Sequence, residues 1–351
     1  MRIYDSQLWI SDLDEILETL PELQTLEEKS VLITGAAGLI CSSVTDLLIR
    51  YNEKHDKKID ISVAGRWLSE MEDRFGDFVT KQYYHYVQYD ASKTNENLNG
   101  TFDYIIHGAS NASPNMIVKE PVETMTGNFL GMKNLLDLAK RCNTKRVLYI
   151  SSSEVYGLKK VNVPYSESEY GFIELLNSRN SYSISKRATE TLCVSYADEY
   201  GVDSVIVRPG HIYGPTASPN DNRVSSAWAY SAVHGEDIVM KSDGSQIRSY
   251  CYCLDCASAI LKVLLCGESL HAYNISNPDS IINIKQMAEI IAEYAGIKVY
   301  MEVPTDEERK GFNPMSNSSL ESSSLQKLGW HGVFDAKKGF AHTICILKEI
   351  M

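Results

Sequence analysis

The segment NSYSISKR places Tyr182 and Lys186 four positions apart. On a helix this spacing puts the two side chains on one face. A lysine ammonium near a phenol stabilises the phenolate and lowers the phenol pKa from about 10 toward neutrality, so the tyrosine becomes a usable general base. Such a pair also occurs by chance, but the upstream segment ISSSEVYG adds a serine cluster at the end of a predicted strand. Together the two segments indicate acid–base chemistry.

A second chemical feature is the segment VLITGAAGLIC (31–41), which reads as a strand followed by a phosphate-binding turn. Gly35 permits a tight turn, and Gly38 lets the backbone approach a pyrophosphate at the N-terminus of a helix that begins near Leu39. The third position of such loops is normally a glycine that allows close helix–strand packing, and here it is Cys41. Taken alone, the segment fits either a nucleotide-binding loop or a plain turn.

The end of the next predicted strand, DISVAGR (60–66), bears on the choice of nucleotide. An acidic residue there would bind the ribose hydroxyls of NAD, but this chain has Gly65 and Arg66. An arginine in that place can pair with the 2′-phosphate of NADP. The alternative is an exposed arginine without a ligand.

These segments belong to a regular alternation of short apolar strands and amphipathic helices. The expected strands are 30–36, 60–66, 84–90, 102–110, 146–153 and 203–210, and the clearest helices are 126–142 and 185–201. This alternation predicts βαβ units and a doubly wound parallel sheet of the α/β class, the Rossmann arrangement. Ligands of such sheets bind beyond the carboxyl ends of the strands, which is where the candidate residues fall.

The rest of the chain predicts an N-terminal extension and a smaller lobe. Residues 1–29 form a helical extension, in which Leu13, Ile16, Leu17 and Leu20 share one face, with Ser11 or Asp12 as N-cap. It fits a helix packed on its own domain better than a subunit contact. We expect a dinucleotide-binding domain from 30–212 plus about 249–277, interleaved with a substrate-binding lobe from 213–248 plus 278–351. The serine-rich stretch 316–324 reads as a surface loop.

Composition limits the classes of partner. A net charge of −12 disfavours a nucleic-acid-binding surface and attraction to membranes. No segment approaches the roughly 20 apolar residues of a spanning helix, and the N-terminus lacks the apolar core of a signal peptide, so a cytoplasmic location is expected. The chain has 8 cysteines, of which only those in CYCLDC (251–256) cluster. Buried structural thiols, with the cysteines alternating along a strand, fit this cluster better than a metal site, and we predict no metal.

Several segments occur in the order typical of one family. They are TGAAGLI, YDAS, HGASNASP, SSSEVYG, YSISK, RPGHIYGP and GSQIRSYCYCLD. Over residues 30–345 the chain resembles the extended short-chain dehydrogenase/reductases, the NAD-dependent epimerase/dehydratase family acting on nucleotide sugars. The resemblance implies an enzyme that keeps NAD or NADP bound, acts on a nucleotide sugar through a 4-keto intermediate, and forms a homodimer.

The resemblance also implies roles for individual residues. Tyr182 deprotonates a sugar hydroxyl as hydride leaves C4, Lys186 binds the nicotinamide ribose, and Ser152 hydrogen-bonds the same sugar oxygen. The implied cofactor contacts are Gly35, Ala37, Gly38, Leu39, Ile40, Arg66, Asp90, Ala91, Ala109, Ser110, Asn128, Lys186 and Arg208. The implied substrate contacts are Ser110, Asn111, Ser152, Ser153, His211, Arg223 and Arg248. His211 stands where the family has an asparagine, so it either contacts the substrate or is a packed core histidine.

The residues after Ser152 discriminate among reactions of this family. Members that eliminate water carry an Asp–Glu pair there, whereas this chain has Ser153 and Glu154. A hydroxyl is a poor acid, which counts against a 4,6-dehydratase. The Ser–Ser–Glu order, with ASNASP (109–114) and NDNRVSS (220–226), most resembles UDP-glucuronate decarboxylases, in which a 4-keto uronate loses CO₂. A 4-epimerase, in which Glu154 is only a solvated carboxylate, a 4,6-dehydratase and a non-catalytic binding module are the alternatives.

Overall fold

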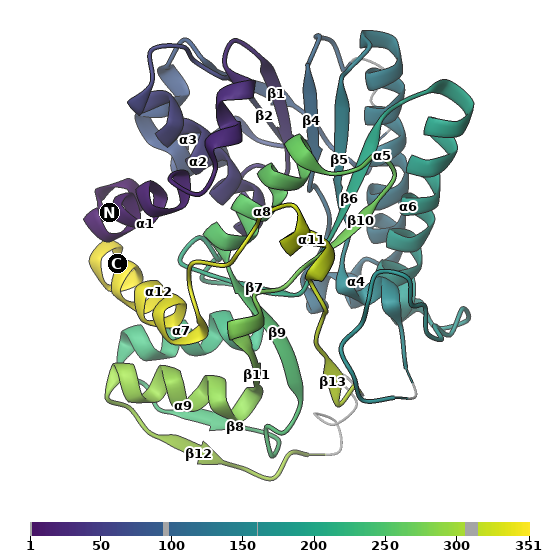
Figure 1. Ribbon diagram of the computed structural model, residues 1–351. Coiled ribbons are helices and arrows are strands. Elements are labelled where there is room, and N and C mark those ends of the chain that lie inside the picture. The colour runs from purple at the N-terminus through teal and green to yellow at the C-terminus, as the bar shows by residue number, and fades with distance from the viewer. Residues whose placement is uncertain (1, 94–97, 160, 306–314) are drawn as a thin grey trace.

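The computed structural model describes residues 2–93, 98–159, 161–305 and 315–351. Within these residues the centre is a parallel sheet with the strand order β10-β6-β5-β4-β1-β2-β3 (Figure 1). The strands are β1 (Ser30–Thr34), β2 (Asp60–Gly65), β3 (Tyr84–Gln88), β4 (Tyr104–His107), β5 (Arg146–Ile150), β6 (Ser204–Pro209) and β10 (Ala272–Ile275). Their order reverses between β1 and β4, the place where doubly wound sheets bind ligands. The predicted fold class is confirmed.

Helices cover both faces of the sheet, which explains why its strands are almost continuously apolar. One face packs α5 and α6 against Leu32, Ile105 and Val147, and the other packs α2 and α8 against Ile33 and Leu148 (Figure 1). The helices of this part are α2 (Leu39–Lys54), α3 (Leu68–Phe75), α4 (Pro114–Lys119), α5 (Pro121–Cys142), α6 (Ser181–Tyr200) and α8 (Cys253–Cys266). Short 3-10 helices are η3 (Gly76–Thr80), η4 (Ser153–Tyr156) and η5 (Ser178–Asn180).

A second, smaller sheet lies below the first in Figure 1 and is joined to it by the chain after β6. Its strands are β7 (His211–Tyr213), β9 (Ile247–Tyr252), β11 (Ile281–Asn283) and β13 (Asn317–Ser318), and β8 (Ile238–Met240) pairs with β12 (Val299–Met301). Its helices are α7 (Val224–His234), α9 (Ile284–Ala295), α11 (Ser323–Lys327) and α12 (Ala336–Ile350), with η6 (Pro278–Ser280). Residues 249–252, expected in the dinucleotide-binding part, therefore pair in the second sheet, whereas α8 and β10 return to the first.

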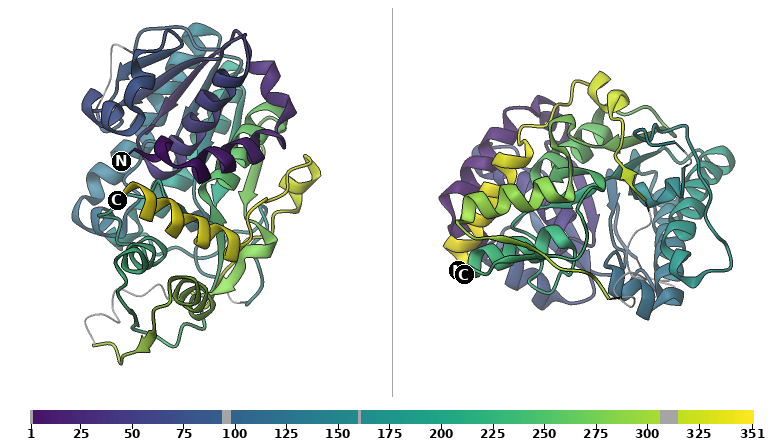
Figure 2. Two further views of the ribbon diagram at one scale, coloured as in Figure 1. Left: turned by 90° about the vertical axis from the view of Figure 1, so that its left-hand side faces the viewer. Right: turned by 90° about the horizontal axis from the view of Figure 1, so that it is seen from below.

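The N-terminal segment packs on its own chain, and its helix begins earlier than predicted. It comprises η1 (Ile3–Asp5), α1 (Gln7–Leu17) and η2 (Pro21–Leu26). The N-cap is Ser6, whose Oγ accepts a hydrogen bond from the Trp9 N–H at 3.2 Å, and not Ser11 or Asp12. Asp12 is instead buried and accepts hydrogen bonds from Tyr252 and His342. The segment thus lies against both α8 and α12, and Figure 2 shows α1 beside α12.

Two local expectations were wrong. The serine-rich stretch 316–324 is not a surface loop, because residues 318–320 are buried and the Leu320 N–H donates to Ser249 Oγ at 2.9 Å. Cys253 does not continue the strand but begins α8. The serine content of 316–324 and the alternation of residues before Cys253 are local features. Neither reveals the contacts that these segments make with the second sheet.

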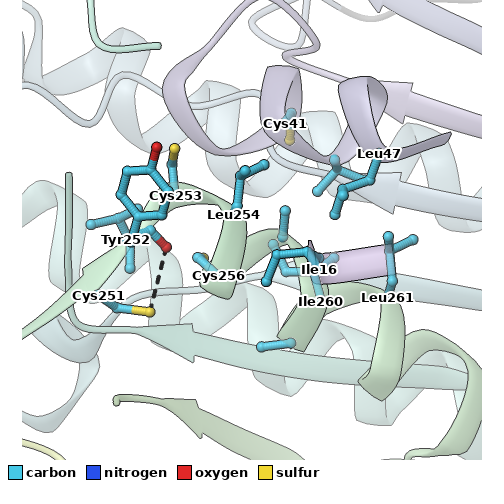
Figure 3. Packing of buried hydrophobic residues seen from close by; sticks show 14 of the residues in the cluster. Ile16, Cys41, Leu47, Cys251, Tyr252, Cys253, Leu254, Cys256, Ile260 and Leu261 are labelled. Atoms are coloured by element: carbon cyan, nitrogen blue, oxygen red, sulfur yellow. Dashed lines mark hydrogen bonds between the residues drawn. The ribbon is translucent and has the colours of Figure 1, made fainter. Parts of the chain in front are cut away.

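The thiols of Cys251, Cys253 and Cys256 are buried, as expected, and lie with Cys41 in one apolar cluster (Figure 3). Burial raises the pKa of Cys253 to about 12, so its thiol stays protonated. Among the described residues, no group of His, Cys, Asp and Glu side chains is arranged to hold a metal ion. In the same part of the chain, no helix is long and apolar enough to cross a membrane.

Candidate active site

The glycine turn after β1 is shaped by close backbone packing. Gly35 has φ +70°, and a Cβ there would lie 2.8 Å from the Ala109 backbone nitrogen. Only glycine fits such a conformation and such a contact. Gly38 is the N-cap of α2, and its N–H donates to Gly35 O at 2.9 Å. The turn therefore points the N-terminus of α2, with Leu39 and Ile40, toward the strand ends, where an anion would be stabilised.

The Cys41 side chain occupies the space beside Gly108, which has no side chain of its own. The residue is buried, and a Cβ built on Gly108 would lie 2.3 Å from its Sγ. The close helix–strand contact usually made by a glycine on the helix is made here by a glycine at the end of β4. Burial raises the pKa of the Cys41 thiol to about 12, so it is a packing group at neutral pH.

The end of β2 carries an exposed Arg66 that faces acidic Asp90 after β3. Burial alone would raise the pKa of Asp90, but hydrogen bonds from Ser92 and the charges of Lys93 and Arg66 lower it. Asp90 is therefore an anion at neutral pH and offsets part of the Arg66 charge. Ala91, next along the chain, contacts α5, where a Cβ on Gly131 would lie 2.8 Å from its methyl group.

Tyr182 and Ser152 meet at the junction of β5 and α6. Their hydroxyl groups are hydrogen-bonded, and Tyr182 is only 7% exposed. The expected fall in the Tyr182 pKa is wrong for this structure: burial, followed by the charge of Glu154, raises the pKa to about 12. Ser152, Arg223 and Arg179 act in the opposite direction but do not outweigh burial.

The position of the Lys186 ammonium explains why it does not lower the Tyr182 pKa. Its Nζ donates to Ile150 O at 2.8 Å and lies 5.6 Å from the centre of the Tyr182 ring. Lys186 is 2% exposed, and burial lowers its pKa to about 7, against the attraction of Glu190. The two side chains share one face of α6 as predicted, but the lysine is directed to the strand end.

The Glu154 carboxylate is contacted by two residues of the segment that carries Tyr182. Its Oε2 accepts a hydrogen bond from Ser183 Oγ at 2.9 Å, and Arg179 Nη1 lies 3.9 Å from the same oxygen. The Glu154 N–H donates to Ser152 Oγ at 3.2 Å, and Ser153 begins η4 between them. Arg179 and Ser183 did not emerge from the sequence, although both lie within three positions of Tyr182.

The second sheet brings three basic residues toward this region. Arg248 on β9 is 4% exposed, and within the described residues its guanidinium makes one hydrogen bond, to Ile247 O at 2.8 Å. Burial, with the charges of Arg248 and Arg223, lowers the pKa of His211 to about 3, so the imidazole is neutral. His211 Nδ1 is buried without a hydrogen-bond partner. Arg223 caps α7 and forms a two-pronged pair with Asp221.

The remaining candidates divide by their surroundings. Ala109, Ser110 and Asn111 follow β4, and Ser110 Oγ is buried without a partner among the described residues. Asn128 is buried between α5 and α6, where its Nδ2 donates to Ser185 Oγ at 2.9 Å. Arg208 is fully engaged by the protein, since it pairs with Glu190 and donates to Tyr156, Tyr170 and Glu167 O. Its position gives it a structural role, and we do not keep it among the cofactor contacts.

His107, at the end of β4, is a further buried polar group beside the lysine. Its Nδ1 lies 2.7 Å from Thr34 Oγ1, and its Nε2 has no partner among the described residues. Burial and the nearby Lys186 charge lower its pKa to about 3. The rule that ligands bind at the carboxyl ends of strands could have singled it out.

A doubly wound sheet with a glycine turn before α2 and a Ser–Tyr–Lys set at the strand ends defines a class of nicotinamide-dependent enzymes. Residues 31–276 match the NAD dependent epimerase/dehydratase family, and the chain belongs to this family. The protein is therefore an NAD-dependent enzyme of the nucleotide-sugar epimerase/dehydratase group.

Curated relatives agree with this assignment, and solved structures agree with the fold. UDP-glucuronic acid decarboxylase 6 of Arabidopsis thaliana is 31% identical over 88% of this chain and 86% of the relative. UDP-glucuronic acid decarboxylase 1 of Xenopus tropicalis is 29% identical over 92% and 73%. In fold, the chain is similar to a UDP-N-acetylglucosamine 4-epimerase of Methanobrevibacter ruminantium (TM-score 0.78, 24% identity, 92% and 99% covered). It is also similar to a dTDP-glucose 4,6-dehydratase of Streptomyces venezuelae with NAD bound (TM-score 0.75, 21% identity, 91% and 97% covered).

Proposed function

We propose that the protein oxidises a nucleotide sugar at C4 with a retained nicotinamide cofactor, and that the sugar is a uronate that then loses CO₂. The observation that carries the choice of reaction is the Ser152–Ser153–Glu154 sequence beside Tyr182. A dehydratase needs an acid at position 153, and a hydroxyl cannot protonate a leaving group at neutral pH. The decarboxylases among the relatives support the same choice.

The buried cations of the second sheet support an anionic substrate. Arg248 is nearly fully buried and has no carboxylate partner among the described residues. An unpaired buried charge is costly, and a substrate anion would provide the missing partner. Neutral His211 can donate or accept a hydrogen bond beside it.

Proton transfer is assigned to the Ser152–Tyr182 pair. Tyr182 takes the proton of the C4 hydroxyl, and Ser152 holds the same oxygen through its hydroxyl group. A nicotinamide bound near Lys186 would supply the hydride acceptor and donor for C4, and its positive charge would favour the Tyr182 phenolate. After oxidation, the carboxylate is β to a ketone, so the C5–C6 electron pair can move toward the C4 carbonyl as CO₂ departs.

The residues around the glycine turn fit a dinucleotide. Gly35 lets the turn pack against the Ala109 backbone, and this turn leads into the N-terminus of α2, where backbone N–H groups can bind a pyrophosphate. We assign the pyrophosphate to this turn and the adenosine end to the region between Arg66 and Asp90. Arg66 supports a 2′-phosphate, whereas the family is NAD-dependent.

A 4-epimerase is the second candidate, and one observation favours it. Glu154 is already bound by Ser183 and Arg179, which suits a carboxylate that only supports the local backbone. Such an enzyme would invert a neutral sugar and release no CO₂.

We also propose a homodimer, supported by exposed apolar side chains on α4 and α5 (Val118, Val122 and Met125).

The decisive experiment incubates the protein with UDP-, dTDP-, GDP- and CDP-linked sugars, each as neutral sugar and as uronate. Proton NMR identifies the product, and CO₂ is measured in the same samples. We expect CO₂ in proportion to product from a uronate. Inversion of a neutral sugar without CO₂ would establish the epimerase, and a 4-keto-6-deoxy product would establish the dehydratase. No turnover of any of them would favour a binding module.

A further inference from the structure

Glu154 carries a negative charge into a region where the proposed substrate brings another. Its carboxylate lies beside Tyr182, whose ionisation it opposes, and beside the Ser152 hydroxyl. Ser183 satisfies one oxygen with a hydrogen bond but adds no charge. The only cation paired with Glu154 among the described residues is Arg179, at 3.9 Å.

We propose that Arg179 is a positioning residue that neutralises Glu154 beside the Tyr182 base and so lets the site accept a sugar with its own carboxylate. This inference rests on the proposed function and deepens it. Without Arg179, the Glu154 carboxylate would repel both the phenolate and the incoming carboxylate. With Arg179 in place, the pair presents little net charge.

The contacts of Arg179 do not suggest a role in folding. Its side chain is 42% exposed and the Glu154 side chain 38% exposed. The distance of 3.9 Å is too long for a good hydrogen bond, and the backbone N–H of Arg179 donates to Asn177 Oδ1. Exposed pairs of this kind add little to stability. Their electrostatic effect grows when a bound substrate excludes water.

The charges around Tyr182 come from every element packed against it. Glu154 lies on η4, Arg179 on η5, Arg223 at the N-cap of α7, and Lys186 on α6 itself. Tyr149 on β5 is the other nearby phenol, and burial keeps it neutral. Of the two arginines, Arg223 lowers the Tyr182 pKa more than Arg179 does, but Arg223 is paired with Asp221, whereas Arg179 is paired with Glu154. Arg179 is thus the cation set against Glu154.

The test uses the NAD-loaded protein and four variants: Arg179→Gln, Arg179→Lys, Glu154→Gln and the Arg179→Gln/Glu154→Gln double variant. Calorimetry compares UDP-glucuronate with UDP-glucose. We expect Arg179→Gln to weaken binding of the uronate about tenfold and to leave UDP-glucose unchanged. The Lys variant keeps the charge and should bind as the wild type does, and the double variant should recover most of the loss. Arg2→Gln, which breaks the exposed pair with Asp77, is the matched control.

A second readout does not depend on the substrate. The ionisation of Tyr182 is followed by tyrosinate absorbance, as the difference between each protein and its Tyr182→Phe counterpart. Arg179→Gln should raise the pH midpoint by roughly half a unit to one unit, and the double variant should return it. An unchanged midpoint, or equal weakening of both sugars, overturns the proposal. If the wild type releases no CO₂ from any uronate, the decarboxylase assignment fails, and the midpoint still decides the role of Arg179.

Discussion

Two buried arginines, Arg208 and Arg248, differ in what surrounds them. Arg208 is 1% exposed, and its guanidinium donates to both oxygens of Glu190 and to two tyrosine hydroxyls. Arg248 is 4% exposed, and among the described residues its guanidinium donates one hydrogen bond, to the backbone carbonyl of Ile247. The first arginine is satisfied by the fold, whereas the second has no carboxylate partner among the described residues. Arg208 lies near the end of β6 and Arg248 near the start of β9, and under the proposed function only Arg248 pairs with a ligand.

The contrast extends to neighbouring polar groups. Ser110 Oγ and His211 Nδ1 are buried without partners among the described residues, and both lie beside the strand ends. Glu190, by contrast, is held within the protein by Arg208. Buried polar groups are normally hydrogen-bonded, so these two unpaired groups near the strand ends support the proposed ligand site. Substitution of residues in the proposed ligand site, such as Arg248, should change turnover. Substitution of residues paired within the protein, such as Arg208, should change the free energy of unfolding.

The largest effect is expected for Tyr182→Phe, which keeps the ring and removes the proton-accepting oxygen. Turnover should fall by roughly a thousandfold or more, because the substitution removes the proposed base. Cofactor and nucleotide-sugar affinities should stay near those of the wild type. Initial rates, bound nicotinamide and Tm are measured together. Unchanged turnover would remove Tyr182 from the mechanism, and a large fall in Tm would assign it to the structural side.

The second prediction compares the two arginines directly. Arg208→Gln leaves Glu190 buried and unpaired and should cost about 3–5 kcal/mol of unfolding free energy. Arg248→Gln should change that free energy by less than about 1 kcal/mol, because it removes a charge that the protein does not pair. It should weaken binding of the acidic substrate about a hundredfold. Denaturant unfolding measures the free energy of unfolding of both variants, and calorimetry measures their substrate binding. Equal losses of stability would contradict the different roles of Arg208 and Arg248.

The sequence was sufficient to predict the alternation of strands and helices along the chain. It was also sufficient to locate the glycine turn, the serine cluster and the segment of Tyr182 and Lys186. The turn after β1 needs glycine for local reasons at Gly35. Helical spacing places Tyr182 and Lys186 on one face, and the upstream serine cluster with the order of motifs singled the pair out. These features depend on residues that are close in the chain, which is why single-sequence reasoning reaches them.

What the sequence could not supply depends on burial and on distant partners. The Tyr182 pKa rises because the surrounding elements remove water, an effect invisible in the spacing of Tyr182 and Lys186. Arg208 pairs with the Glu190 carboxylate on α6, and β9 pairs with β7, β11 and β13 in a separate sheet. The α1 start was placed too late although its signal is local, since Ser6 accepts a hydrogen bond from the Trp9 N–H and the first turn is mostly apolar. Tertiary contacts overrode local pattern in the other cases.

The third prediction concerns packing on the cofactor side. Gly108→Ala would place a Cβ 2.3 Å from Cys41 Sγ and should cost about 1–3 kcal/mol of stability. Cys41→Gly in the same chain should recover most of this loss, because it restores a glycine on the other side of the contact. Cofactor affinity should follow the same pattern, since the contact positions the glycine turn. Failure of Cys41→Gly to rescue would show that Gly108 is needed for another reason.

The smallest effect is expected for Arg66→Ala, because Arg66 is exposed and lies at the edge of the proposed adenosine site. If Arg66 contacts a 2′-phosphate, NADP affinity should fall about tenfold, and NAD affinity should stay unchanged. Stability should change by no more than about 0.5 kcal/mol, as for other surface positions. Fluorescence titration of the cofactor-free protein with each dinucleotide measures the ratio. An equal loss for both, or no loss, would leave Arg66 as a surface charge balanced by Asp90 and would make the NAD preference of the family the simpler description of this site.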